Sequence, residues 1–185
     1  MLLSPTLRPT EGFIQLKPPA EAFNVACGKE EGQLKLYDRL EARGTGSSHA
    51  TMYQEVVRQI HRSDTNTCTV QVIDLDHFIQ REGIRKVHLL KVDTEGHDLS
   101  VLLGIRNSIE SGIVDVVHFE FNEMNVFSRT FLRDFRNVLP GYVFFRMLPD
   151  GLVPLGEYIP LVCELFAYQN IVAVPERCLP GQKGG

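Results

Sequence analysis

The stretch HLLKVDTEGHD at residues 88–98 decides the expected fold, because an apolar strand pattern runs directly into a polar turn. Residues 87–92 are nearly all apolar, which is typical of strands buried on both faces of a parallel sheet. Apolar residues then recur at helical spacing from Leu99 to Ile109, and Gly112 suits the position after a helix end. Ligands of open α/β sheets bind beyond the carboxyl ends of the strands, so the stretch predicts a ligand-facing turn between a strand and a helix.

The same alternation of strand and helix patterns continues on both sides of this stretch. Further strands are expected over residues 23–27, 33–37, 69–72, 113–121, 142–147 and 168–174. Further helices are expected over residues 50–61, 74–82 and 131–138. No proline interrupts residues 21–139, so the middle of the chain can hold continuous elements. The alternation predicts an α/β fold built on a mostly parallel sheet.

The length of 185 residues suits a single domain. Four of the ten prolines fall within residues 1–20, which are therefore expected to form an extended N-terminal segment. Residues 21–175 are expected to form the α/β domain itself. Residues 176–185 end in two glycines and are expected to be a flexible tail.

Composition excludes several classes of protein. The net charge of −4 and a pI near 5.9 argue against a nucleic-acid partner, which would require a basic face. No window offers about 18 uncharged apolar residues, so no membrane span is expected. The N-terminus lacks the apolar core of a signal peptide, and a cytoplasmic location is expected. The four cysteines form no Cys-x-x-Cys pair, which predicts reduced thiols with no zinc site and no disulfide.

Asp93, Glu95 and His97 follow the strand over 87–92 and are the first candidate site residues. They would gather at the carboxyl end of that strand, and Gly96 would allow close approach of backbone or ligand. Helix capping is the alternative interpretation. Asp93 or Thr94 could cap the following helix, and acidic residues could simply face its positive end. No metal-ligand set is predicted among these residues.

Glu120 and Asn122 are the second pair of candidates, because they end the neighbouring strand pattern. Glu120 stands between two phenylalanines, so in a strand its side chain points away from both. Two adjacent strands that end in carboxylates would form the floor of a polar pocket. The alternative is that Glu120 is merely solvated or ion-paired.

These stretches resemble the FkbM family of S-adenosylmethionine-dependent methyltransferases. The most specific part is the block LLKVDTEGHDLSVLLG at residues 89–104. Asn24 to Gly28 with Glu31 to Tyr37 resembles the family's third strand and hairpin, and Val70 to Phe78 resembles the lead-in to its fourth strand. Phe119 to Asn122 resembles its fifth strand, and Asn170 to Ala173 resembles its last strand. The resemblance covers roughly residues 23–174.

The resemblance implies a class I methyltransferase sheet with helices on both faces and S-adenosylmethionine as the cofactor. It implies O-methylation of a sugar or another small hydroxylated metabolite. Asp93 would lie nearest the cofactor's methyl group, and Glu95 and His97 would orient or deprotonate the acceptor hydroxyl. Glu120 and Asn122 would bind the acceptor.

The N-terminal part departs from the family. Its first strand normally ends in a glycine-rich cofactor loop, and its second ends in an acidic residue that holds the ribose. Residues 1–20 offer only Gly12 and Glu11 for these roles. The expected fold is therefore an incomplete class I (Rossmann-like) sheet that lacks its first two strands, which lie between the third and the fourth.

Two explanations of this departure remain open at the level of sequence. The chain is expected either to be a piece of a longer enzyme or to close the gap by pairing its strands differently. The corresponding functional alternatives are two. One is a methyltransferase, and the other is a non-catalytic binding or regulatory module, or the degenerate remnant of a methyltransferase.

Overall fold

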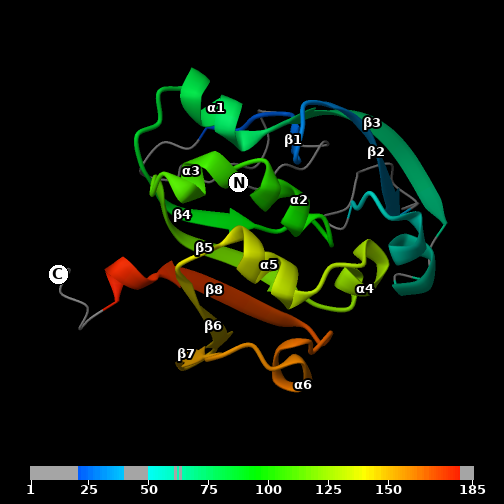
Figure 1. Cartoon of the computed structure of the whole chain (residues 1–185). Helices are drawn as coiled ribbons and strands as arrows, with labels where there is room; N and C mark the ends of the chain where they lie inside the picture. The colour runs from blue at the N-terminus through cyan, green and yellow to red at the C-terminus, as the bar shows by residue number, and fades with distance from the viewer. Residues whose placement is uncertain (1–20, 40–49, 61, 63, 180–185) are drawn as a thin grey trace.

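The computed structural model describes residues 21–39, 50–60, 62 and 64–179, and these residues form two separate β-sheets with helices between and beside them (Figure 1). The predicted N-terminal segment 1–20 and the last residues of the predicted tail lie outside the described ranges. The α/β class expected from the sequence is confirmed.

The smaller sheet has three strands in the order β1-β3-β2. These strands are β1 (Ala26–Cys27), β2 (Gly32–Arg39) and β3 (Thr65–Ile73). Strand β1 pairs in parallel with β3, and β2 pairs with β3 in antiparallel fashion along its whole length. Both longer strands extend beyond the ranges expected from sequence, because eight cross-strand pairs lengthen each of them.

The larger sheet has five strands in the order β4-β5-β8-β6-β7. Its strands are β4 (Val87–Val92), β5 (Val114–Phe121), β6 (Tyr142–Leu148), β7 (Gly151–Pro154) and β8 (Gln169–Pro175). Only the β4–β5 pair is parallel, and the other three pairs are antiparallel. The expectation of a mostly parallel sheet is therefore wrong for the strand pairs, because β8 inserts in antiparallel fashion between β5 and β6, and a short turn makes β7 antiparallel to β6.

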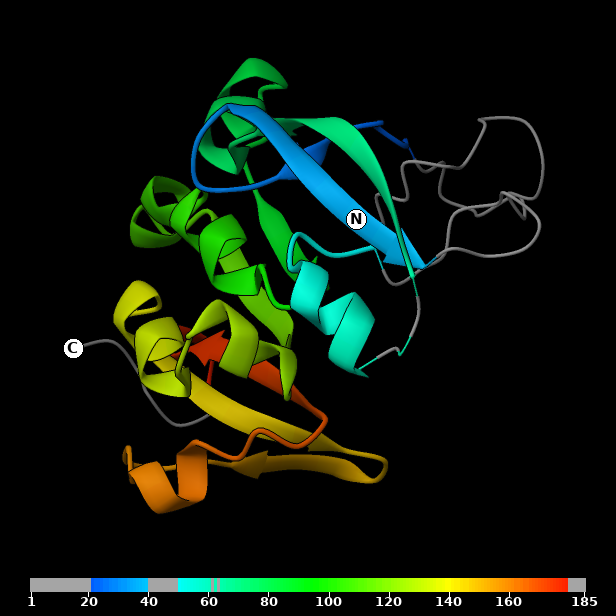
Figure 2. The ribbon, with the colours of Figure 1, turned by 90° about the vertical axis from the view of Figure 1, so that its right-hand side faces the viewer.

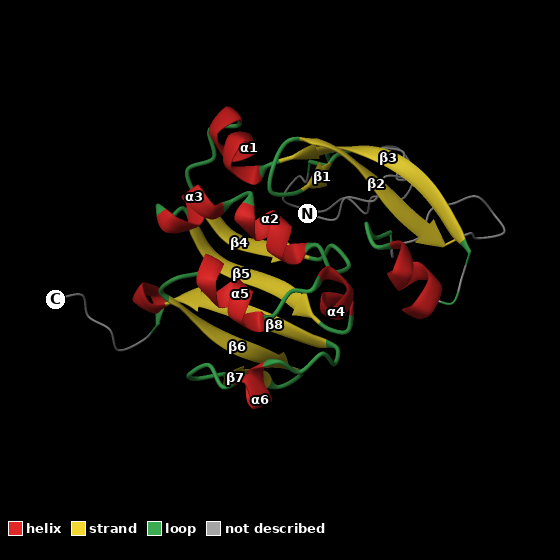
Figure 3. Ribbon diagram, turned by 45° about the vertical axis from the view of Figure 1, so that its right-hand side comes forward, coloured by secondary structure: helices red, strands yellow, loops and turns green. Residues whose placement is uncertain are grey.

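Helices lie against one face of the larger sheet, where α2, α3 and α5 sit side by side (Figures 1 and 3). The helices that sequence predicted are α1 (Leu75–Arg81), α2 (Asp98–Leu103), α3 (Arg106–Glu110) and α5 (Leu132–Val138). The single helix expected from Leu99 to Ile109 is in fact two helices. Gly104 lies at the break, and glycine is required there because a Cβ would lie 2.0 Å from the carbonyl oxygen of Gly28.

Some elements carried no clear sequence signal. They are α4 (Met124–Ser128), β7 and α6 (Pro160–Cys163), which are all five residues long or less. The helix expected over 50–61 is represented by the π-helix η1 (Val56–Ile60), and Figure 2 shows it below strand β2 of the smaller sheet, which it contacts. The predicted flexible tail begins with an ordered 3-10 turn, η2 (Glu176–Cys178).

The core lies between the larger sheet and its helices. Phe119 of β5 stacks on Phe135 of α5 with ring centroids 4.4 Å apart, and both side chains are fully buried. Strand β4 was expected to be buried on both faces, but Leu89 is 59% exposed and only Val92 of this strand is fully buried. Within the described residues β4 pairs with β5 alone, which leaves β4 at an edge of the sheet. Nowhere in the described ranges is a helix long and apolar enough to cross a membrane.

Candidate functional site

The carboxyl ends of β4 and β5 bring two of the predicted site residues together. The register pairs Lys91 with His118 and Val92 with Phe119, so Asp93 follows β4 at the level of Glu120. The two strands are parallel, and their carboxyl ends therefore open on the same edge of the sheet. The local apolar pattern explains why β4 forms, and its parallel register with β5 explains why the carboxylates of Asp93 and Glu120 lie close together.

Burial and the neighbouring Asp93 carboxylate raise the pKa of Glu120 above its ordinary value. Two hydrogen bonds hold the Glu120 carboxylate in place. Tyr168 donates its hydroxyl to Oε1 at 3.0 Å, and the Asn122 amide donates to Oε2 at 3.4 Å. The two carboxylates repel each other at this edge, so a positive charge bound between them would be stabilised.

Lys91 supplies the one ammonium that the described residues bring to this carboxylate pair. It forms an ion pair with Asp93, and that hydrogen bond is the main cause of the raised pKa of Lys91. The charge of Glu120 raises the pKa of Lys91 further. Both members of the ion pair are partly exposed, with 40% of the Lys91 side chain and 28% of the Asp93 side chain accessible. The pair can therefore open to a charged ligand at modest cost.

Residues 94–97 form a tight loop with unusual backbone geometry. Glu95 has φ +53° and Gly96 has φ +95°. A side chain at Gly96 would lie 3.2 Å from the Cβ of Met124, so glycine is needed both for the backbone angle and for the space. The Thr51 hydroxyl donates to the Glu95 carbonyl at 2.9 Å and ties the loop to a segment far away in sequence.

His97 points away from the carboxylate pair. Its Nε2 lies 3.5 Å from the position that a Cβ on Gly28 would take, so the ring sits against the end of β1. Burial lowers the pKa of His97, which favours the neutral imidazole at neutral pH. Within the described residues, no hydrogen bond or ion pair joins this ring to Asp93 or Glu120.

Asp98 is the most buried acidic residue of the site, with 2% of its surface exposed. Its Oδ1 accepts a hydrogen bond from the Thr94 backbone at 3.2 Å. Burial raises the pKa of Asp98 to about 7, with a small contribution from the charges of Asp93 and Glu120. The capping alternative for Asp93 and Thr94 is wrong, because His97 occupies the N-cap position of α2.

Asn122 is also buried, with 4% exposed, and its side-chain oxygen accepts a hydrogen bond from the Met124 backbone at 2.9 Å. Its amide group is thus committed to the protein, and it orients Glu120. The structure gathers Asp93, Glu120 and Asn122 in one cluster, whereas His97 lies on the β1 side. Sequence reasoning passed over Lys91 and Tyr168. Lys91 could have been recognised as the single charge in an apolar strand, but nothing in the local sequence marks Tyr168.

The fold is an α/β domain, and the carboxylates of Asp93 and Glu120 make one edge of its larger sheet polar and anionic. The chain belongs to the methyltransferase FkbM domain family, whose family model matches residues 6–144. The match therefore begins within residues 1–20 and ends in β6, before β8. A search of curated proteins and a search of solved structures each found no match.

Proposed function

We propose that this chain acts in S-adenosylmethionine-dependent O-methylation of a hydroxyl group on a sugar or another small metabolite. The observation that carries the proposal is the pair of carboxylates, Asp93 and Glu120, side by side at the carboxyl ends of two parallel strands in an FkbM methyltransferase domain. Ligands of such sheets bind at this edge.

The chemistry of this edge fits the proposed cofactor. S-adenosylmethionine bears a sulfonium and an ammonium, and both are cations. Asp93 raises the pKa of Glu120 through charge repulsion, which is added to the effect of burial. A cation bound beside the two carboxylates would relieve that repulsion and replace the Lys91 ammonium as the partner of Asp93.

When bound, the cofactor supplies an electrophilic methyl group. Asp93 would hold the cofactor's cationic part, since it is partly exposed and fixed at the end of β4. Glu120 would accept a hydrogen bond from the acceptor hydroxyl, oriented by Asn122 and Tyr168. His97 would take the proton only from an acceptor that extends from Glu120 to the β1 side, where the His97 ring lies, and Glu95 would orient the acceptor from the neighbouring loop.

A second candidate function is a binding module that holds the cofactor or the acceptor without transferring the methyl group. The observation that favours it is the edge position of β4, which within the described residues has β5 as its only neighbour in the sheet. A binding module needs only one side of a ligand pocket, whereas methyl transfer needs both reactants held in line.

Isothermal titration of the 185-residue chain with S-adenosylmethionine tests the cofactor site. Micromolar binding is expected. Asp93→Asn should weaken it about tenfold, by loss of a charge that faces the cofactor. Asp115→Asn is the matched control, because Asp115 also pairs with a lysine and is similarly exposed, at 22% against 28%, but lies at the start of β5.

Transfer is measured separately, by following the labelled methyl group of the cofactor into a panel of sugars and small alcohols. Labelled ether products that disappear in His97→Ala support the methyltransferase. Binding that depends on Asp93 without any labelled product supports the binding module. No heat on titration, or equal weakening by Asp93→Asn and Asp115→Asn, contradicts a cofactor site at Asp93 and with it the proposed methyl transfer.

A further inference from the structure

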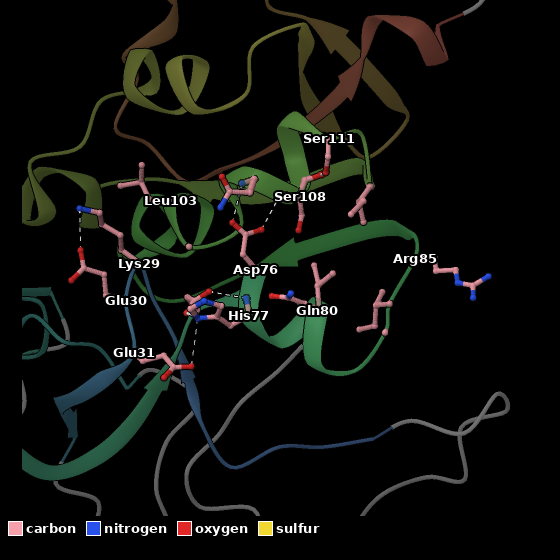
Figure 4. A pocket seen from close by; sticks show the side chains of 17 residues that line it. Lys29, Glu30, Glu31, Asp76, His77, Gln80, Arg85, Leu103, Ser108 and Ser111 are labelled. Atoms are coloured by element: carbon pink, nitrogen blue, oxygen red, sulfur yellow. Dashed lines mark hydrogen bonds and ion pairs between the residues drawn. The ribbon is translucent and has the colours of Figure 1, made fainter.

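A cavity of about 950 Å³ opens between α1, α3 and the turn that follows β1, away from the carboxylate pair. Its wall includes Ile84 and Arg85, which precede β4, and Ile113, which precedes β5. It therefore lies at the amino ends of the two parallel strands, and the proposed methyl-transfer site does not use it. Figure 4 shows the cavity with Glu31 and His77 facing each other in its wall.

Three potential metal ligands converge in this wall, namely Glu31, Asp74 and His77. One donor atom from each lies within 4.8 Å of the others. Nδ1 of His77 is 2.7 Å from Oδ2 of Asp74 and 3.8 Å from Oε1 of Glu31. Donor atoms bound at about 2.1 Å to one tetrahedral ion stand about 3.4 Å apart, so these distances need only small side-chain shifts.

The sheet register brings the three residues together. Gly32 pairs with Val72 at the end of the β2–β3 ladder, so Glu31 reaches the level at which β3 ends and Asp74 begins the turn into α1. His77 lies in the first turn of α1, three residues after Asp74. The Asp74 Oδ1 atom accepts a hydrogen bond from the His77 backbone at 2.9 Å, which fixes the carboxylate and leaves Oδ2 turned toward the imidazole.

The electrostatic environment favours a cation. Four carboxylates line the cavity, against one lysine and one arginine. Asp74 is buried, and among the described residues no lysine or arginine pairs with it; its neighbour is the exposed imidazole of His77. Oδ1 of Asp74 is occupied in capping α1, and Oδ2, which faces the imidazole, is the oxygen that remains to bind an ion.

We propose that Glu31, Asp74 and His77 form a binding site for a divalent transition-metal ion of the Zn²⁺ type, with its open coordination position facing the cavity. Imidazole together with carboxylates is a donor set suited to Zn²⁺, whereas Mg²⁺ and Ca²⁺ prefer oxygen ligands alone. On metal binding, Nδ1 of His77 would give up its contact with Oδ2 of Asp74 and offer its lone pair to the ion. Three protein ligands leave one position for water or for a ligand in the cavity.

Titration of metal-free protein with ZnCl₂ tests the proposal. One ion per chain is expected to bind at micromolar concentration. Glu31→Gln and His77→Ala should each weaken binding about tenfold or more, since each removes one ligand. Asp74→Asn should do the same without unfolding α1, because asparagine remains a good N-cap residue. Glu30→Gln is the matched control, as Glu30 is the adjacent exposed carboxylate and pairs with Lys29 instead.

Cobalt substitution separates this site from the free thiols, two of which are exposed. A Co²⁺ spectrum without thiolate charge-transfer bands, abolished by His77→Ala, supports the site. Three results overturn it. One is a dissociation constant for Zn²⁺ above about 100 µM. Another is binding that survives Glu31→Gln and His77→Ala. The third is binding of Mg²⁺ that is tighter than binding of Zn²⁺ and that requires Glu31, Asp74 and His77. None of these outcomes bears on methyl transfer, which the Asp93 variant tests independently.

Discussion

Asp98 makes the stability of this protein depend on pH, and Asp98→Asn should remove that dependence. Burial raises the pKa of Asp98 from 3.8 to about 7. Below pH 4 the carboxyl is protonated in both the folded and the unfolded chain. Between pH 4 and pH 7 the folded chain retains a proton that the unfolded chain releases, so the free energy of unfolding falls as the pH rises.

The size of the stability change follows from the shift in the pKa of Asp98. About three pKa units at 1.36 kcal/mol each correspond to roughly 4 kcal/mol of stability lost between pH 4 and pH 8. Asparagine is neutral throughout this range and can still accept the hydrogen bond from the Thr94 backbone. The difference in unfolding free energy between Asp98→Asn and the unmodified chain should therefore shift in favour of the variant by about 4 kcal/mol from pH 4 to pH 8.

Urea denaturation at several pH values between 4 and 8 measures this difference. Asp150→Asn is the control, because Asp150 is exposed in the turn between β6 and β7 and should give no such trend. A constant offset between Asp98→Asn and the unmodified chain at every pH would refute the reasoning, since it would mean that Asp98 has the same affinity for protons in both states. A trend of opposite sign would refute it as well.

Three further substitutions probe packing and the site. Gly104→Ala should cost about 1–3 kcal/mol in urea denaturation, because the new Cβ would lie 2.0 Å from the Gly28 carbonyl, whereas Gly32→Ala meets nothing within 4 Å and should be close to neutral. Phe135→Ala should cost about 3–5 kcal/mol, since it empties a fully buried position stacked on Phe119. Tyr168→Phe should raise the pKa of Glu120 further, as followed by carboxyl NMR titration, because the tyrosine hydrogen bond lowers that pKa; an unchanged or lower value would contradict the assigned contact.

Much of the local structure could be predicted from the sequence. The apolar run at residues 87–92 gave the bounds of β4, and the glycines at 83 and 112 mark the ends of α1 and α3 with φ of +63° and +76°. These features depend on side chains and backbone freedom within a few residues, so the local pattern contains the information. The carboxylates of the site were found for the same reason, as they directly follow or end strands.

Other features depended on contacts between distant segments. The need for glycine between α2 and α3 comes from the close approach of Gly28 to Gly104, and these residues are far apart along the chain. The orientation of His97 toward β1 and the hydrogen bond from Tyr168 to Glu120 have the same origin. The convergence of Glu31 on Asp74 and His77 requires the β2–β3 register.

The sequence by itself determined the α/β class, most of the strands and helices, the polar stretches at the ends of β4 and β5, and a resemblance to a family that the family match then confirmed. Only the tertiary structure decided which strands pair and in which direction, because strand pairing joins residues that the local pattern does not relate. It also decided which acidic groups lie close together, and burial together with this proximity raises the pKa of Asp98 and of Glu120.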